Sequence, residues 1–191
     1  MQVSTLELFP TTVVVIDDFL NDSELQNFYA VINQHHVDQA MVGTRLRDSD
    51  QNLITDDLDW FYQKIRVAVT QHYNLSVNIF EAVYNNMRWG DSLLFHHHFS
   101  HDHWQQLDLD TLIILTACYY TNSGDGFAKL RFNNPQLLSR LLGQPGDYSI
   151  EPKPNSLLLF PSWSFHGTTI HQSMTIRHCL VAEMTVNRAQ K

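Results

Sequence analysis

Residues 94–104 read LFHHHFSHDHW and hold five of the chain's eleven histidines. If this stretch begins as a strand, alternate side chains point to the same face. His96 and His98 then project together, while His97 points the other way. Two imidazoles on one face can form one arm of a metal site, since imidazole binds Fe, Zn, Cu and Ni. The competing interpretation is a histidine-rich surface loop that holds no metal.

A mononuclear site needs a further ligand from elsewhere in the chain. His166 is the candidate because it follows an apolar run and the segment FPSWSF at 160–165, and precedes Gly167. A histidine at the end of a strand is accessible enough to bind a metal. A lone histidine among aromatic residues is also commonly a hydrogen-bonded structural residue, so this alternative stays open.

Arg177 lies inside the apolar run MTIRHCLV at 174–181. A guanidinium group does not enter a dry core unless it meets an anion there. Arg177 therefore either points to solvent or clamps a carboxylate, for which its planar fork is suited.

Hydrophobic patterning predicts an N-terminal helical region followed by a β-rich region. The run 11–16 is β-branched and predicts a strand, Asn21 and Glu24 have the spacing of a capping box, and a second helix begins near residue 56. Short β-like runs follow at 77–89, 111–120, 127–132, 156–160 and 174–186. This order predicts a sandwich or jelly roll with helices packed on one sheet. The turn residues NSGDG at 122–126 predict a hairpin between the second and third runs.

Length and composition indicate one globular domain over residues 1–191, with 1–75 as supporting strand and helices and 76–191 as the β core. The chain is 43% hydrophobic and 17% charged, and its net charge of −8 argues against broad binding to nucleic acid or anionic membrane. We find no signal-like segment or apolar span, and expect a cytoplasmic protein. Cys118 and Cys179 lie in apolar runs, which indicates reduced core residues.

Several short motifs, in this order over nearly the whole chain, resemble the Fe(II)- and 2-oxoglutarate-dependent oxygenases, in particular a group related to prolyl hydroxylases. Each motif is moderately specific, and their shared order and spacing are much more so. They are LFPTTV at 8–13, WGD at 89–91, HHH at 96–98, CYY at 118–120, the segment 126–135 that ends in FNNP, FPSW at 160–163, His166 and Arg177.

The resemblance implies a mainly β, α+β fold, the double-stranded β-helix or jelly roll, with iron between its sheets on two histidines and a carboxylate. By position, His96 and His166 are the two histidines, and His98 stands where the wider superfamily usually has Asp or Glu. Three imidazoles would leave Fe(II) with more net positive charge than a set containing a carboxylate. Asp102 is the alternative second ligand if its segment folds back.

The resemblance also implies 2-oxoglutarate as co-substrate, chelating the iron. Arg177 would pair with its far carboxylate, and Tyr120 occupies the position of a tyrosine that hydrogen-bonds the same group. Thr116 shares a strand face with Tyr120, and Asn86 falls where some relatives use a further contact. Structural packing is the alternative role for Thr116 and Asn86.

The implied activity is that of a dioxygenase that uses 2-oxoglutarate and O2, hydroxylates a protein or peptide side chain, and releases succinate and CO2. Two other classes stay open. One is a cupin-like metal-binding protein without 2-oxoglutarate turnover, and the other is a non-enzymatic jelly-roll binding or assembly module.

Overall fold

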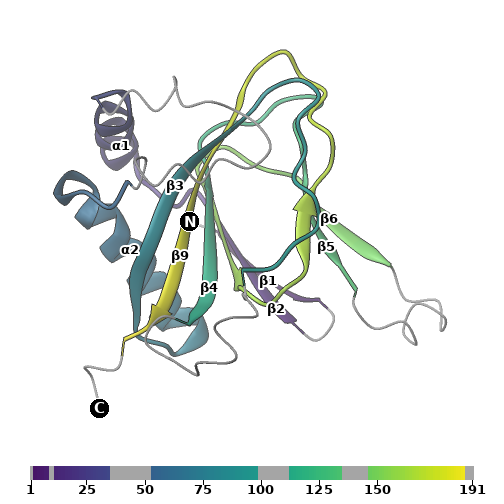
Figure 1. Ribbon diagram of the computed structural model, residues 1–191. Coiled ribbons are helices and arrows are strands. Elements are labelled where there is room, and N and C mark those ends of the chain that lie inside the picture. Colours follow the sequence, from purple (N-terminus) through teal and green to yellow (C-terminus); the bar gives the residue numbers. More distant parts are fainter. Residues whose placement is uncertain (1, 9–10, 35–52, 99–111, 135–145, 188–191) are drawn as a thin grey trace.

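The computed structural model describes residues 2–8, 11–34, 53–98, 112–134 and 146–187. Within them the chain forms two β-sheets and two α-helices, with the helices before most of the strands. Figure 1 shows the helices on one side of the large sheet and the strands β5 and β6 on the other. The predicted order of helices followed by a β core is confirmed.

The larger sheet has six antiparallel strands in the order β1-β2-β7-β4-β9-β3. Its central strands are among the most apolar of the chain, since β4 and β7 are buried on both faces over most of their length. The bounds are β1 Gln2–Leu8, β2 Thr11–Asp17, β3 Val77–Met87, β4 Ile113–Tyr120, β7 Ser156–Pro161 and β9 Arg177–Val186.

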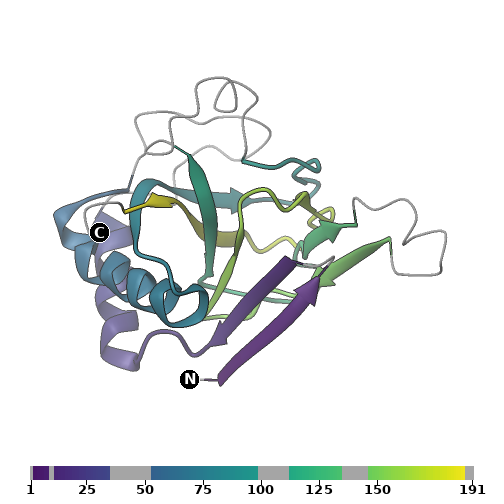
Figure 2. The same cartoon turned by 90° about the horizontal axis from the view of Figure 1, so that it is seen from below.

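The smaller sheet has three strands in the order β6-β5-β8, with bounds β5 Leu130–Asn133, β6 Asp147–Ile150 and β8 His166–Thr168. His96 pairs with His166 through an isolated antiparallel bridge, so the histidine-rich segment lies along the free edge of β8. We call residues 94–98 the histidine arm. Figure 2 shows the two sheets from below, with the green strands of the small sheet toward the right of the view.

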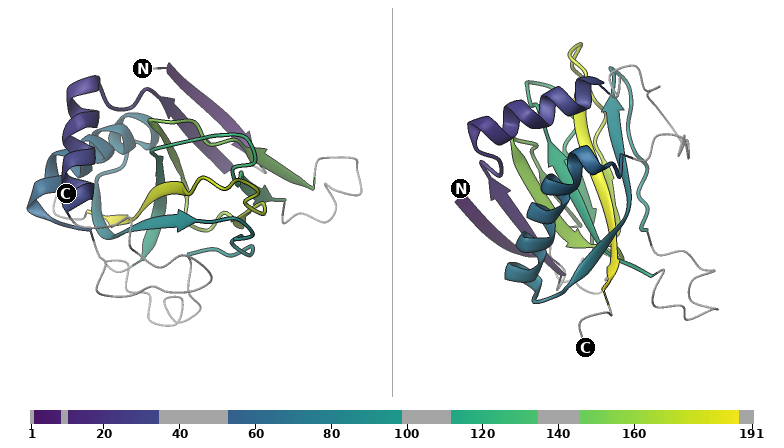
Figure 3. Two further views of the ribbon diagram at one scale, coloured as in Figure 1. Left: turned by 90° about the horizontal axis from the view of Figure 1, so that it is seen from above. Right: turned by 90° about the vertical axis from the view of Figure 1, so that its left-hand side faces the viewer.

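Helices α1 (Asp22–Gln34) and α2 (Asp59–Tyr73), the latter preceded by the short 3-10 helix η3 (Asp56–Leu58), cover one face of the large sheet, as Figure 3 shows. Strand alternation separates two cores: Tyr119 packs against Phe28 and Phe61 on the helix side, with ring centroids 5.1 and 5.2 Å away. Its neighbour Tyr120 enters the space between the sheets with Phe132 and Phe160. The sheet therefore has an inner face that is available for a site.

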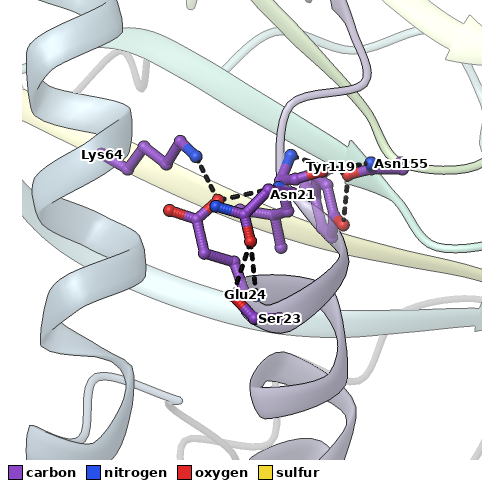
Figure 4. A network of polar contacts seen from close by, with 7 residues as sticks. Asn21, Ser23, Glu24, Lys64, Tyr119 and Asn155 are labelled. Carbon is purple, nitrogen blue, oxygen red and sulfur yellow. Dashed lines mark hydrogen bonds and ion pairs between the residues drawn. The ribbon is translucent and has the colours of Figure 1, made fainter.

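The start of α1 is held by the predicted capping box. Asn21 accepts the Glu24 N–H through Oδ1 at 3.0 Å, and Glu24 Oε2 accepts the Asn21 N–H at 2.8 Å. Lys64 of α2 forms an ion pair with the same carboxylate, and Asn155 receives the Tyr119 hydroxyl at 3.0 Å (Figure 4). This network joins both helices to the sheet they cover.

The predicted hairpin between β4 and β5 is wrong. Strand β4 pairs with β7 and β9 in the large sheet, whereas β5 pairs with β6 and β8 in the small one. Residues 122–126 turn the chain from one sheet to the other, since Phe127 N–H bonds to Gly124 C=O at 3.1 Å without further pairing between the strands. The turn residues predict that the chain reverses direction here, but they do not predict which strand β5 pairs with.

Two further expectations concern the cysteines and the membrane. Cys118 and Cys179 are both buried and free, as predicted. No helix in the described part of the chain is long and apolar enough to cross a membrane.

Candidate metal centre

Three histidines from two segments converge at the edge of the small sheet. His96 and His166 exchange main-chain hydrogen bonds of 2.8 and 2.9 Å, and the His98 N–H bonds to Ser162 C=O at 3.0 Å. These bonds hold the histidine arm alongside residues 162–166 through a single bridge at His96, with His96 and His98 partly buried and His97 exposed. The arm therefore presents two imidazoles to the third.

The ligand atoms of His96, His98 and His166 all lie within 4.8 Å of one another. The Nε2 atoms of His98 and His166 are 3.1 Å apart. Two nitrogens bound to one metal at about 2.1 Å and about 90° apart would be separated by about 3.0 Å. The spacing of these two atoms is that of neighbouring ligands on one ion.

The other ring nitrogens set the tautomers. His96 Nδ1 lies 2.8 Å from the Leu94 carbonyl oxygen, and His166 Nδ1 lies 2.8 Å from that of Ser164. A carbonyl oxygen can only accept, so each Nδ1 carries the proton and each Nε2 keeps a lone pair. The Nε2 lone pairs face one another, an arrangement that a bound cation stabilises.

His166 is neutral in this setting. Burial, together with the neighbouring rings of His98 and His96, lowers the pKa of His166 to about 3, against a raising contribution from the bond to Ser164. A neutral imidazole is the form that binds a metal. The group is 5% exposed, so proton and metal compete for a site largely screened from solvent.

A second cluster lies at the start of β9, in the space between the sheets. Arg177 is 2% exposed; its Nη1 lies 3.0 Å from Met87 Sδ, and its guanidinium carbon lies 4.8 Å from the centre of the Tyr120 ring. No acidic side chain among the described residues pairs with Arg177, and its Nε is buried without a hydrogen-bond partner. Burial raises the pKa of Tyr120 well above its usual value, although Arg177 opposes this, so the hydroxyl stays protonated.

Arg177 and Tyr120 together are suited to binding an anion. A buried guanidinium is costly unless a negative group neutralises it, and thioether sulfur is only a weak acceptor. Arg177 and the Tyr120 hydroxyl offer donors from two neighbouring strands to one carboxylate. The alternative that Arg177 points to solvent is excluded by its burial.

The chain resembles known proteins in its fold and not in its sequence. No protein-family model matches the chain, and no curated protein matches it in sequence. A prolyl-4-hydroxylase from Pseudomonas putida aligns over 92% of each chain with a TM-score of 0.62 and 15% identity. HygX from Streptomyces hygroscopicus, with nickel and 2-oxoglutarate bound, aligns over 92% of this chain and 82% of its own, with a TM-score of 0.63 and 12% identity.

A third similar structure is the non-heme α-ketoglutarate-dependent epimerase SnoN from nogalamycin biosynthesis, with a TM-score of 0.65, 12% identity, and coverage of 91% of this chain and 77% of that one. The chain has the fold of the 2-oxoglutarate-dependent oxygenases. The predicted jelly roll is confirmed. Because the similar structures include a hydroxylase and an epimerase, the oxygenase fold alone does not select a reaction.

Within the oxygenase fold, Thr116 and Asn86 lie on opposite faces of the large sheet. Thr116 is buried on the inner face, where its hydroxyl lies 3.0 Å from that of Ser162. Asn86 pairs in register with His178, and its Oδ1 lies 2.6 Å from that ring's Nδ1. His178 alternates with Arg177 along β9, so Asn86 bonds on the face away from the Arg177 cluster. We therefore leave Asn86 out of the proposed co-substrate contacts.

Asp102, the alternative second ligand, lies outside the described residues. Among those described, sequence reasoning missed Glu183, whose carboxylate contacts His98 Nδ1. The sequence does contain a sign of this residue. Glu183 lies inside an apolar strand, an even number of residues after Arg177, and should therefore lie on the same face of that strand.

Proposed function

We propose that this protein is a non-haem, Fe(II)- and 2-oxoglutarate-dependent dioxygenase. The observation that carries the proposal is a pair of sites in the space between the two sheets. One is a set of three histidines with converging lone pairs, and the other is a buried arginine without an anion. The similar solved structures, one holding nickel and 2-oxoglutarate, support this pairing.

His96, His98 and His166 would hold the iron. The Nδ1 protons of His96 and His166 are engaged by main-chain carbonyls, and Nδ1 of His98 contacts the Glu183 carboxylate, which would orient each ring for the metal. Three protein ligands would leave further positions on the ion for the co-substrate and for O2.

Arg177 and Tyr120 would hold the far carboxylate of 2-oxoglutarate. The guanidinium supplies charge and a fork of donors, and the protonated phenol supplies one further hydrogen bond. Thr116 lies on the same face as Tyr120, four residues away, and bonds to Ser162 beside the histidine arm. It would line the path between the two sites.

When bound, iron and 2-oxoglutarate supply an oxidation in which one atom of O2 enters succinate, CO2 is released, and the other atom enters the prime substrate. The chain contributes placement: it holds the ligands and the far carboxylate on a rigid sheet and limits the access of water. The inner faces of β4 and β7 serve this purpose with Cys118, Leu158 and Phe160.

For the prime substrate we propose a protein or peptide side chain. Exposed apolar side chains surround the histidine arm: Leu94 is 78% exposed, Trp163 55% and Phe165 37%. The Phe165 ring stacks on Phe95 at 5.5 Å and lies 6.3 Å from His97. Exposed aromatic side chains beside a site are suited to contacting a polypeptide. Two of the similar solved structures are prolyl hydroxylases.

The test is iron-dependent formation of succinate from 2-oxoglutarate by the purified protein, together with anaerobic binding of 2-oxoglutarate to the Fe(II) form. Arg177→Ala should abolish binding at concentrations that saturate the wild type, and Tyr120→Phe should weaken it about 10- to 150-fold, by the loss of one hydrogen bond to a charged group. The matched control is Arg88→Ala, which removes an exposed arginine one residue beyond β3.

Each outcome separates the candidate functions. A protein that binds Fe(II) but neither binds nor consumes 2-oxoglutarate would be a cupin-like metal protein. A protein that binds neither would be a binding or assembly module. Either result contradicts the proposed dioxygenase.

A further inference from the structure

Glu183 is a carboxylate buried beside the three histidines. It lies on the inner face of β9, six residues after Arg177, and is 5% exposed. In register it faces Thr116 of β4 on one side and Glu81 of β3 on the other. A buried glutamate is costly unless its charge is paired or hydrogen-bonded.

Its partner is His98. Glu183 Oε1 contacts His98 Nδ1, and the two side chains are 6% and 9% exposed. The same ring's Nε2 points toward His166. The carboxylate thus lies one imidazole ring away from the position of the metal, outside the group of converging ligand atoms.

This contact distinguishes His98 from its two neighbours. His96 and His166 donate their Nδ1 protons to neutral main-chain carbonyls, whereas His98 faces a carboxylate. A carboxylate that accepts the Nδ1 proton fixes the tautomer and makes the imidazole a stronger donor to a metal. His98 is also the residue that stands where the resemblance places a carboxylate ligand.

We propose that Glu183 is a positioning residue that supplies, one ring further out, the negative charge that His98 lacks as a ligand. It holds the His98 ring with Nε2 toward the metal and offsets part of the positive charge of a divalent ion bound by three imidazoles. The inference rests on the proposed metal site but not on the reaction catalysed there.

The first test is metal affinity, measured anaerobically by competition between the protein and a chromophoric chelator for Fe(II), and repeated with Co(II). Glu183→Gln keeps an acceptor for the Nδ1 proton but removes the charge, and Glu183→Ala removes both. We expect about 10- to 100-fold weaker binding in Glu183→Gln, as is typical when the partner of a ligating histidine is changed, and a larger loss in Glu183→Ala.

The matched control is Glu81→Gln, which removes a carboxylate from the register position beside Glu183 and should bind metal within about 2-fold of the wild type. The circular dichroism spectra and melting temperatures of the metal-free variants show whether each one folds. The visible spectrum of the Co(II) form adds a readout of the ligand set, because loss of His98 from the metal changes its bands.

A second comparison uses His98→Asp, which places a carboxylate at the ligand position itself. In that background the ligand itself is charged and Glu183 has no imidazole to orient, so Glu183→Gln should weaken metal binding much less than it does with His98 in place. Equal effects of Glu183→Gln in both backgrounds would contradict the proposal, as would wild-type affinity in the single variant.

The outcomes also separate this inference from the proposed function. Metal binding that depends on Glu183 without formation of succinate would overturn the dioxygenase and leave the role of Glu183 standing. Succinate formation by a protein whose metal affinity does not depend on Glu183 would overturn the role of Glu183 and leave the dioxygenase standing. A wild-type protein that binds no divalent metal would overturn both.

Discussion

His166 illustrates how burial prepares a single side chain for metal binding. Its ring lies between the sheets, packed against Phe160 with centroids 4.8 Å apart. Its Nδ1 proton is engaged by the Ser164 carbonyl oxygen, which leaves Nε2 without a proton. The cost of charging this ring keeps it in the neutral form, which is the one that can bind a metal, over the whole physiological pH range.

The depressed pKa of His166 predicts a pH dependence of stability for the metal-free protein. The folded value is about 3 and the unfolded one 6.5, so between these limits only the unfolded chain takes up the proton. The free energy of unfolding should therefore fall as the pH drops from 6.5 to about 3, by at most about 1.4 kcal/mol per pH unit from this residue. Above pH 6.5 this contribution is constant. Denaturant titrations at several pH values measure it.

The control for this titration is His97→Gln, which changes an exposed ring in the same arm and should keep the slope. His166→Gln should reduce it. A wild-type slope in His166→Gln would show that other groups cause the acid sensitivity.

Among the elements, β8 and the histidine arm approach each other more closely than a side chain at Gly167 would allow. A Cβ atom there would lie 2.8 Å from the Leu93 carbonyl oxygen and 3.1 Å from the main chain of Leu94 and of Phe95. Space, not backbone conformation, requires glycine at this position. The close contact with Gly167 thus fixes the position of the first residues of the histidine arm.

Gly167→Ala should therefore push the arm away from β8 and separate His96 and His98 from His166. We expect a destabilisation of about 1–3 kcal/mol, typical of overpacking, together with metal binding weakened at least about 10-fold. Isothermal titration with Co(II) measures the affinity. Gly124→Ala, whose Cβ would meet only the Phe127 ring at 3.0 Å, is the control and should leave the affinity unchanged.

The first turn of α1 offers a prediction about the supporting layer. Asn21→Ala removes the side chain that accepts the Glu24 N–H, and should lower the free energy of unfolding by about 1 kcal/mol. Asn21→Asp keeps an acceptor and should stay close to the wild type. Urea denaturation compares the two, and a wild-type free energy of unfolding in Asn21→Ala would show that the cap contributes nothing to stability.

Across the whole molecule, the proposed metal site joins the two sheets. His96, His98 and His166 belong to the small sheet and its edge, whereas Glu183, which contacts His98, belongs to the large sheet. A bound ion therefore stabilises the packing between sheets and not one element alone. Because a ligand that binds only the folded state stabilises it, metal binding should appear in the melting temperature.

At a free metal concentration 100 times the dissociation constant, the folded state gains about 2.7 kcal/mol, or about 5–10 °C in melting temperature for a chain of this size. Scanning calorimetry with and without Co(II) tests this. His97→Ala should keep the shift and His96→Ala should lose it. A shift of equal size in both variants would place the metal elsewhere.

Local patterns predicted much of this architecture because they depend on neighbours in the chain. The capping box at Asn21, the alternation that turns His97 outward, and the reduced cysteines follow from short-range rules, and the structure agrees with each. Strand ends shifted by up to three residues, as for β9, which begins at Arg177 and not at 174. The strands β1, β6 and β8 were not predicted, since each carries weak or very short patterning.

Pairing over long distances lay beyond those patterns. The turn at 122–126 predicts a reversal, but the sheet that receives β5 depends on partners in β6 and β8 that come later in the chain. The contact between His98 and Glu183 spans 85 residues, and it exists because the register of β9 against β4 brings Glu183 to the inner face near the arm. Side-chain periodicity is encoded locally and can be counted along the chain, whereas the distance between two strands is decided only when the sheets pack.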